Sequence, residues 1–563
     1  MGGGAGQREF TFTALALGVA MAVAFGAANA YLGLRVGLTV SASIPAAVVS
    51  MGILRVAMRR DSILENNMVQ TIASAGESLA AGAIFTMPAM YLWAEEGLCA
   101  PPGMFPLAVM ALAGGVLGVL LMVPLRRPLI VEEDATLVYP EGRACADVLK
   151  AGEGGAGRAK TVFLGFAVAA AVKVVTDVLK WIPAAVSHSF GRLRGAIGME
   201  IAPALLGVGY VAGPKAATLL FAGSLLGWMV LMPLCCALMP EAAALWEKGG
   251  ARLVWSECIR YIGAGAIAAG GVISIMKSIP LFVRTFRAAK GAMQASSAER
   301  DLPLPRVFAG VAAVIALLWA APAVPVGLCG AVLIAVFGFF FAAVSARMVG
   351  FVGSSNNPVS GMTIVTLVVA ALALKATGAA GAAGMLAAMS VGSVVCIVSA
   401  IAGDTAQDLK TGRILGATPW RQQVGELVGV AASAVAIGGV LALLHAAWGF
   451  GSEQLAAPQA TLMKVVVEGI MGSSLPWELI AVGAAIAVVL ALCRVPVMPC
   501  AIGIYLPVGV NAAIFVGGAA RYLADRRSTS SAADSPGTLF AAGLVAGEGL
   551  CGILLALVAL MCR

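Results

Sequence analysis

Charged and aromatic residues are scarce in this 563-residue sequence. Only 11% of the residues are charged and 6% are aromatic, whereas 60% are apolar, and the mean hydropathy is +0.97. Because a soluble globular domain has about 25% charged and about 45–50% apolar residues, a water-soluble globule is excluded. The apolar residues form long unbroken runs, unlike the short alternating strands of an outer-membrane barrel. The sequence therefore predicts a helical membrane protein with many spans.

Motifs that mark enzymes and ATP-driven pumps are missing. No HExxH or GxSxG sequence occurs, so the usual zinc and serine hydrolase sites are absent. Residues 154–161 end in Lys-Thr, but Ala159 stands where a phosphate-binding loop needs a glycine. The eleven cysteines are scattered without a CxxC pair. We therefore expect no enzyme, no disulfide framework, no metal site and no cofactor.

The net charge of +8 sits in loops beside the apolar runs. This placement follows the positive-inside rule of membrane proteins, so we expect no nucleic acid as a partner. The basic connections alternate with acidic or neutral ones, which predicts a cytoplasmic N-terminus and a multi-pass protein of the cell inner membrane. The basic connections are 55–60, 126–160, 284–306 and 410–421.

The order of the polar signals suggests two related halves. The basic loop at 284–306 is the best midpoint, so we expect an N-terminal membrane half at 1–290 and a C-terminal membrane half at 291–563. By loop count, the spans that carry Glu77 and Asp404 run in opposite senses, as in the inverted repeats of secondary transporters. The matching positions are Pro45 and Pro358, Gly76-Glu77-Ser78 and Gly403-Asp404-Thr405, and Tyr139-Pro140 and Leu506-Pro507.

A polar stripe crosses an otherwise apolar stretch at residues 66–78. Asn66, Gln70, Ser74, Glu77 and Ser78 lie three or four residues apart and share one helical face. Because polar groups are costly in hydrocarbon, this face must look into the helix bundle or a watery cavity. We expect a substrate or proton pathway, although hydrogen bonding between helices is the alternative. The expected substrate-binding residues are Asn66, Asn67, Gln70, Ser74 and Ser78, and Glu77 is the expected acid.

A second polar segment, residues 353–361, interrupts a long apolar region with glycine and proline. This pattern is typical of a broken helix, and unwound backbone at membrane depth is tolerated where it lines a cavity. An ordinary loop between helices is the alternative. The expected substrate-binding residues here are Ser354, Ser355, Asn356 and Asn357.

A third polar segment, residues 403–410, is expected to open a basic loop. Asp404 is a candidate cavity carboxylate that acts with Glu77 in proton coupling, whereas Asp408 is expected to be a loop residue beside Lys410. Farther back, Lys173 and Asp177 lie four residues apart, and we expect an ion pair that neutralises their helix.

The same polar segments resemble a known family. Runs such as ENNMVQTIASAGESLAAGAIFTMPA, GSSNNPVSGMTI and IAGDTAQDLKTGRILGATP are similar to the oligopeptide transporter (OPT) family. The similarity extends over residues 31 to 550 and is closer to the bacterial members and the yellow stripe-like branch than to the fungal peptide branch. The acidic run Glu132-Glu133-Asp134 departs from the family loop.

The resemblance implies import of small peptides or metal–chelate complexes, driven by protons. It also implies an all-α polytopic membrane protein of about sixteen transmembrane helices, within the 14 to 18 allowed at roughly 30–35 residues per span and connection. We expect broken or re-entrant segments and two pseudo-repeated halves. The expected partners are the substrate, protons and membrane lipid, with a homo-oligomer left open. An uncoupled channel, or a membrane-embedded subunit that binds lipid or a partner protein, is the alternative.

Overall fold

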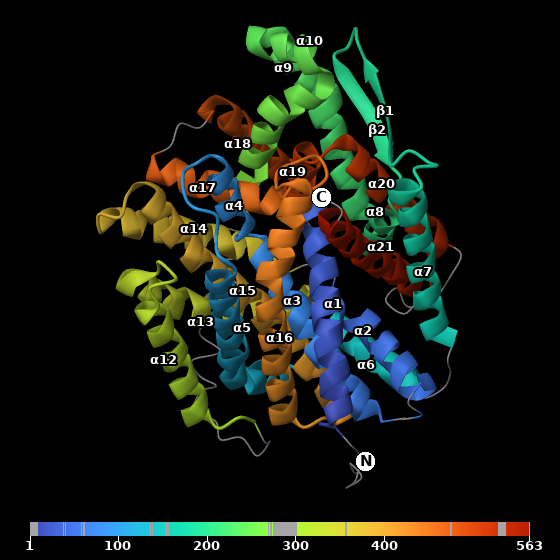
Figure 1. The fold of residues 1–563 in the computed structure, drawn as a ribbon, viewed down its shortest axis with the longest axis vertical. Coiled ribbons are helices and arrows are strands. Elements are labelled where there is room, and N and C mark those ends of the chain that lie inside the picture. Colours follow the sequence, from blue (N-terminus) through green and yellow to red (C-terminus); the bar gives the residue numbers. More distant parts are fainter. Residues whose placement is uncertain are drawn as a thin grey trace.

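The computed structural model consists almost entirely of helices (Figure 1). Eight helices in the described part of the chain are long and apolar enough to cross a membrane, and shorter apolar helices lie between them. This confirms the predicted all-α polytopic architecture. The expected boundary at residues 290–291 lies outside the described residues. The structure describes residues 9–561 except 38, 40, 58, 60–61, 135–136, 138, 153–156, 268, 271–272, 274–300, 355–356, 473–475 and 527–535.

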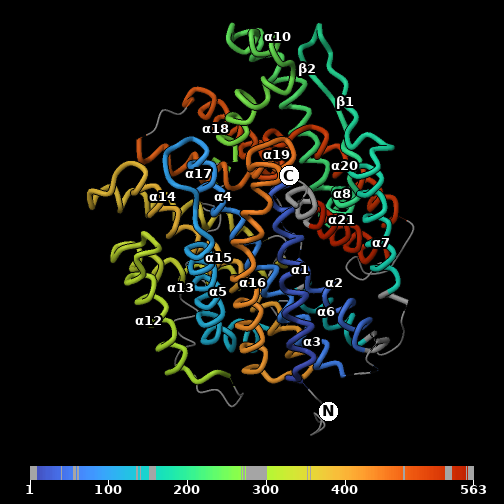
Figure 2. Tube along the Cα trace, viewed as in Figure 1, coloured from blue at the N-terminus to red at the C-terminus, as the bar shows by residue number. Residues whose placement is uncertain are grey.

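The elements follow one another along the chain as traced in Figure 2. The elements before residue 270 are α1 (Phe12–Val36), α2 (Ser43–Met51), η1 (Gly52–Ala57), α3 (Ile63–Ile84), α4 (Pro88–Glu95), α5 (Met104–Arg126), η2 (Arg127–Glu132), α6 (Pro140–Gly152), α7 (Gly157–Lys173), η3 (Val174–Val178), β1 (Ala185–Phe190), β2 (Gly195–Glu200), α8 (Pro203–Leu225), η4 (Leu226–Leu231), α9 (Met232–Leu238), α10 (Pro240–Val254) and η5 (Trp255–Ile259), where η marks a π-helical stretch. The later helices are α12 (Leu304–Ala320), α13 (Gly327–Val352), α14 (Val359–Ala376), α15 (Gly381–Leu415), α16 (Pro419–Trp448), α17 (Pro458–Met471), α18 (Trp477–Leu492), α19 (Val497–Tyr505), α20 (Val508–Asp525) and α21 (Pro536–Met561).

Local sequence signals define many helix ends. The Thr11 hydroxyl accepts a hydrogen bond from the backbone N–H of Ala14 and so caps α1, and Ser62 caps α3 in the same way. At their other ends, α1 and α15 stop at Gly37 and Gly416, whose positive φ angles of 75° and 80° suit glycine. These caps satisfy backbone groups that a helix end leaves without partners.

Helices from distant parts of the sequence pack together in pairs, among them α8 with α20 and α3 with α15. Along the second pair, Gln70 bonds to Asp408 and Ser74 bonds to Asp404. From one bonded pair to the next, the residue number increases along α3 and decreases along α15. The two helices are therefore antiparallel. This confirms the prediction that the spans of Glu77 and Asp404 run in opposite senses.

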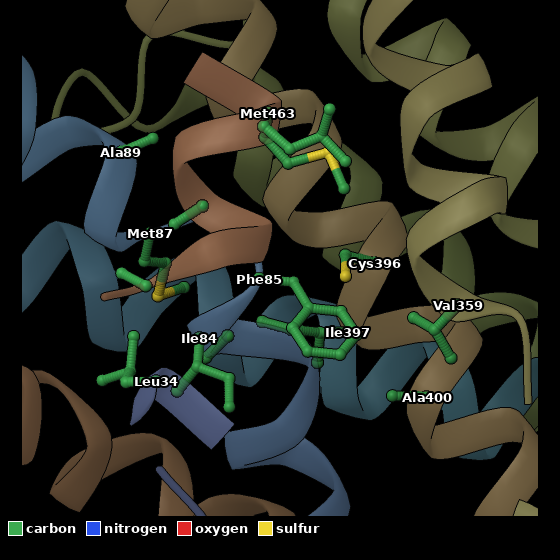
Figure 3. Packing of buried hydrophobic residues seen from close by; sticks show 14 of the residues in the cluster. Leu34, Ile84, Phe85, Met87, Ala89, Val359, Cys396, Ile397, Ala400 and Met463 are labelled. Carbon is green, nitrogen blue, oxygen red and sulfur yellow. The ribbon is translucent and has the colours of Figure 1, made fainter. Parts of the chain in front are cut away.

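The apolar core runs between α3, α15 and α17, as Figure 3 shows for Ile84, Phe85, Ile397 and Met463. Small residues let these helices approach closely. A Cβ atom at Gly82 of α3 would lie 2.7 Å from the Cα atom of Ile397. Such close contacts are how membrane helices associate where burial of apolar surface offers little driving force.

One local element differs from the helical expectation. Strands β1 and β2 form an antiparallel hairpin at the upper right of Figure 1, near α9 and α10. The side chains of β1 are mostly exposed, including Val186 at 57%. Six-residue strands carry only a weak sequence signal beside apolar runs, because their alternation spans few residues. The hairpin was therefore not predicted from the sequence.

The close contact of α8 with α20 leads to a stability prediction. A methyl group added at Gly517 would overlap the carbonyl oxygen of Leu206, whereas nothing lies within 4 Å of a methyl group at Gly439. We expect Gly517→Ala to lower the free energy of unfolding by about 1–3 kcal/mol through overpacking. Gly439→Ala, the matched control, should be neutral or stabilising by up to about 1 kcal/mol. Thermal unfolding in detergent checks both, and equal stabilities would contradict the close packing.

Candidate functional site

A cavity of about 450 Å³ lies where α3, α8, α19 and the break between α13 and α14 meet. Its volume is within the range of small-molecule sites, about 300–1,000 Å³. The wall formed by α8 and α19 is largely apolar and includes Val208, Leu220 and Ile502. The polar lining residues, called the polar wall below, are Thr39, Ser41, Glu77, Ser78, Glu141, Ser354, Asn357, Ser360 and Gln459.

Glu77 is the predicted acid on this polar wall, and it is 3% exposed. One carboxylate oxygen accepts a hydrogen bond from the Asn29 amide, and the other accepts one from the backbone N–H of Ala42 at 3.3 Å. The charged groups that act on Glu77 are Asp404 and Glu141, which are both acidic. Within the described residues, no lysine or arginine pairs with Glu77. The cavity wall therefore carries an acid without a basic partner.

The structure interrupts the helix in the predicted segment. Helix α13 ends at Gly353, which has a φ angle of 84°, and α14 begins at Val359. Between them, the backbone N–H of Ser354 donates to Glu141 Oε2 at 3.1 Å and to Gln407 Oε1 at 3.2 Å. Residues within this interruption line the cavity, among them Ser354 and Asn357.

The side chain of Asn357 also takes part in this break. Its amide nitrogen donates to the hydroxyl of Ser345 at 2.7 Å, which ties the break to α13. Ser354 and Asn357 line the cavity as the sequence predicted. The other two predicted residues of the segment, Ser355 and Asn356, lie outside the described residues.

The predicted polar face of α3 divides into two parts. Glu77 and Ser78 line the cavity, whereas Asn66, Gln70 and Ser74 bond to neighbouring segments outside the cavity lining. Gln70 Nε2 donates to Asp408 Oδ1 at 2.7 Å, and Ser74 Oγ donates to Asp404 Oδ1 at 2.8 Å. Asn66 Oδ1 accepts from the Ser50 hydroxyl at 3.0 Å, and Asn67 is fully buried. The face thus connects the cavity with buried carboxylates on α15.

The expectation that Asp408 is a loop residue is wrong. Helix α15 continues to Leu415, and Asp408 is 0% exposed within it. Polar groups of neighbouring segments allow the helix to continue, because they partner its buried polar side chains. The Thr411 hydroxyl donates to the carbonyl of Gly142 at 2.9 Å, and Lys410 pairs with Asp134.

The structure also assigns a role to the acidic run at 132–134. Each carboxylate pairs with a basic side chain: Glu132 with Arg127, Glu133 with Arg347, and Asp134 with Lys410. The hydrogen bond from Lys410 holds the pKa of the half-exposed Asp134 below its usual value. This run therefore supplies partners for basic residues at the end of the helix bundle.

A network of ion pairs lies away from the polar wall. Lys173 pairs with Asp177 at 2.7 Å, as predicted. Arg35 of α1 pairs with both Glu200, at the end of β2, and Glu548 of α21. Lys173 Nζ also lies 4.0 Å from Glu548 Oε1, so the network joins segments from the start, middle and end of the chain.

Sequence reasoning missed several residues of the site. Glu141 and Gln459 line the cavity, and Asn29 bonds to Glu77, but no spacing along the chain connects them with α3. Glu426 of α16 is fully buried beside Asp404 and Asp408. The sequence could have indicated Glu426 as a functional residue, because a lone carboxylate within a long apolar run is energetically costly unless it has a function.

A helical membrane protein with many apolar helices and a polar cavity between them has the construction of a membrane transport protein. Comparison with known proteins agrees with this class. A family model described as OPT oligopeptide transporter protein matches residues 9–559. A Haemophilus influenzae protein described as "Putative oligopeptide transporter" is 36% identical over 600 residues, covering 94% of this chain and 92% of that protein. The chain belongs to the OPT family, and it is a membrane transport protein, not an enzyme.

Proposed function

We propose that this chain is a proton-coupled symporter that imports small peptides across the inner membrane. The observation that carries the proposal is the cavity wall on which Glu77 lies beside hydroxyl and amide groups without a basic partner. A peptide offers N–H and C=O groups along its length, and these match the side chains of Ser78, Ser354 and Asn357. The apolar wall of α8 and α19 accommodates peptide side chains.

Proton coupling is proposed to begin at Glu77, with Asp404 as the second acid of the pathway. A charged carboxylate is costly in a buried site that also holds a second negative charge. Binding a proton at Glu77 removes this cost, and release on the other side of the membrane restores it. Ser74 bonds to Asp404 one helical turn from Glu77, so a polar connection between the two acids exists.

The deeper predicted residues belong to the same proposal. Asn66, Asn67, Gln70 and Ser74 extend the polar face inward from the cavity, and we propose that they contact substrate or protons during transport. Ser355 and Asn356 are proposed to bind substrate together with the rest of their segment. Two pseudo-repeated halves, 1–290 and 291–563, and a cytoplasmic N-terminus complete the proposed organisation.

The proposed substrate class is tested by ligand-dependent stability. Purified protein is heated with di- and tripeptides or with metal–chelate complexes, since a ligand that binds only the native state stabilises it by mass action. We expect a peptide to raise the melting temperature. Stabilisation by chelates without any effect of peptides would contradict the proposed cargo.

A cavity variant tests where the peptide binds. Ala81 lines the cavity one turn beyond Ser78, so Ala81→Trp fills part of the space. We expect at least a tenfold loss of peptide affinity, which is about 1.4 kcal/mol of binding free energy. Ala81→Ser is the matched control and should keep the affinity. Equal peptide affinities in the tryptophan variant and the wild type would place binding elsewhere.

A further inference from the structure

Three buried carboxylates meet one turn deeper than the cavity. Asp404 and Asp408 come from α15 and Glu426 from α16, and each is 0% exposed. Each carboxylate contributes an oxygen, and these oxygens all lie within 4.8 Å of one another. Three negative charges this close cannot persist in a buried site unless something compensates them.

Basic side chains of the described residues do not provide that compensation. Lys410, two residues beyond Asp408, pairs with Asp134, and Arg421, five residues before Glu426, pairs with Glu9. In the part of the chain that the structure describes, neither lysine nor arginine forms an ion pair with the three carboxylates. The compensating positive charge must therefore come from bound protons or from a bound cation.

Uncharged oxygens around the cluster also lack partners. The Thr405 hydroxyl is fully buried and faces the Glu426 carboxylate, yet it forms no hydrogen bond of normal geometry. Gln70 is fully buried too. Its amide nitrogen is 2.7 Å from Asp408 Oδ1, which holds its unpartnered Oε1 near the same carboxylate. Both Glu426 oxygens and Asp408 Oδ2 are likewise without partners.

The donor set is made of oxygen alone, which hard cations prefer over zinc or copper. Two ligands on opposite sides of a calcium ion are about 4.6–5.2 Å apart, because each lies about 2.3–2.6 Å from the ion. The 4.8 Å limit among the carboxylate oxygens fits this separation. A divalent ion also neutralises two of the three charges.

We propose that Asp404, Asp408 and Glu426, with the Gln70 carbonyl and the Thr405 hydroxyl, bind a hard divalent cation of the calcium, manganese or magnesium class. The site is separate from the peptide cavity, and its ion does not depend on which substrate the cavity takes. Asp404 belongs to both proposals, whereas Asp408 and Glu426 belong to this one alone. The test therefore substitutes Asp408 and Glu426.

Manganese serves as the probe because its free form is measured directly by electron paramagnetic resonance. Chelator-treated protein in detergent, without peptide or a pH gradient, is titrated with Mn²⁺ at high NaCl concentration. We expect saturable binding of one Mn²⁺ per chain, displaced by Ca²⁺. Asp408→Asn and Glu426→Gln should each weaken the affinity by at least about tenfold, since loss of a group that merely supports a ligand already costs about 10–100-fold. The control Asp525→Asn, at the exposed end of α20, should bind as the wild type does.

The absence of saturable Mn²⁺ binding in the wild type, or unchanged affinity in both carboxylate variants, would overturn the site. If the carboxylate variants do not fold, Thr405→Val keeps the side-chain shape while removing one ligand oxygen, and an unchanged affinity in that variant overturns the site. Because no transport is measured, failure here leaves the peptide proposal standing. Conversely, a peptide screen without hits leaves the Mn²⁺ result intact.

Discussion

Replacing Glu77 by glutamine should abolish proton-driven accumulation of peptide. Glutamine keeps the size of the side chain and an oxygen that accepts hydrogen bonds from Asn29 or Ala42, so the cavity keeps its shape. It does not take up and release a proton in the transport cycle. In proteoliposomes with an acidic exterior, the variant should bring the internal peptide concentration to the external level and no higher. Exchange of labelled for unlabelled peptide should continue, because it needs binding without net proton movement.

The control for this experiment is Glu453→Gln, which changes an exposed carboxylate in the loop between α16 and α17. It should accumulate peptide as the wild type does. Accumulation by Glu77→Gln at the wild-type level would remove Glu77 from the coupling mechanism. Loss of exchange together with accumulation would show that Glu77 serves binding instead of coupling.

The second large effect is expected at Arg35, which holds together distant segments of the fold. Its Nη1 lies 2.8 Å from Glu548 Oε1, its Nη2 pairs with Glu200, and its side chain is 14% exposed. The other Glu548 oxygen accepts a hydrogen bond from the backbone N–H of Ala204 at the start of α8. Arg35→Ala should cost about 3–5 kcal/mol of unfolding free energy, because breaking a buried ion pair leaves an uncompensated charge.

Arg252→Ala is the matched control, since Arg252 and Glu453 form a pair whose side chains are 68% and 45% exposed. An exposed pair contributes about 0–1 kcal/mol, so this variant should unfold close to the wild-type temperature. Chemical denaturation in mixed detergent micelles gives both values. Equal effects of the two substitutions would mean that water reaches the Arg35 network.

The double variant Arg35→Ala/Glu200→Ala should recover part of the lost unfolding free energy, because one of the carboxylates left without its arginine partner is then removed.

Composition and periodicity were sufficient for the helical architecture and for part of the polar wall of the cavity. Long apolar runs predicted the membrane helices, and Gly353 and Pro358 correctly marked the break between α13 and α14. The three-to-four spacing placed Glu77 and Ser78 on one face, and both line the cavity. These features are local, so a single stretch of sequence contains the information.

The parts that could not be predicted depend on contacts between distant segments. Asp408 was predicted to be a loop residue because Lys410 lies two positions away. The pairing of Lys410 with Asp134, a contact between distant segments, explains how α15 continues past it. Glu141 and Gln459 reach the cavity from α6 and α17 through tertiary packing. The helices can thus be predicted from local stretches of sequence. The partners of each buried polar group depend on how the helices pack together, so they cannot.

The central claim, that a proton gradient drives peptide import, is tested most directly by accumulation in proteoliposomes that contain the wild-type chain. A labelled tripeptide is supplied outside at acidic pH with a neutral interior, and a protonophore is added once uptake reaches a plateau. We expect the internal concentration to exceed the external one, and to fall back to it when the protonophore removes the gradient. A plateau at equal concentrations that the protonophore does not change would contradict coupling and identify an uncoupled pathway.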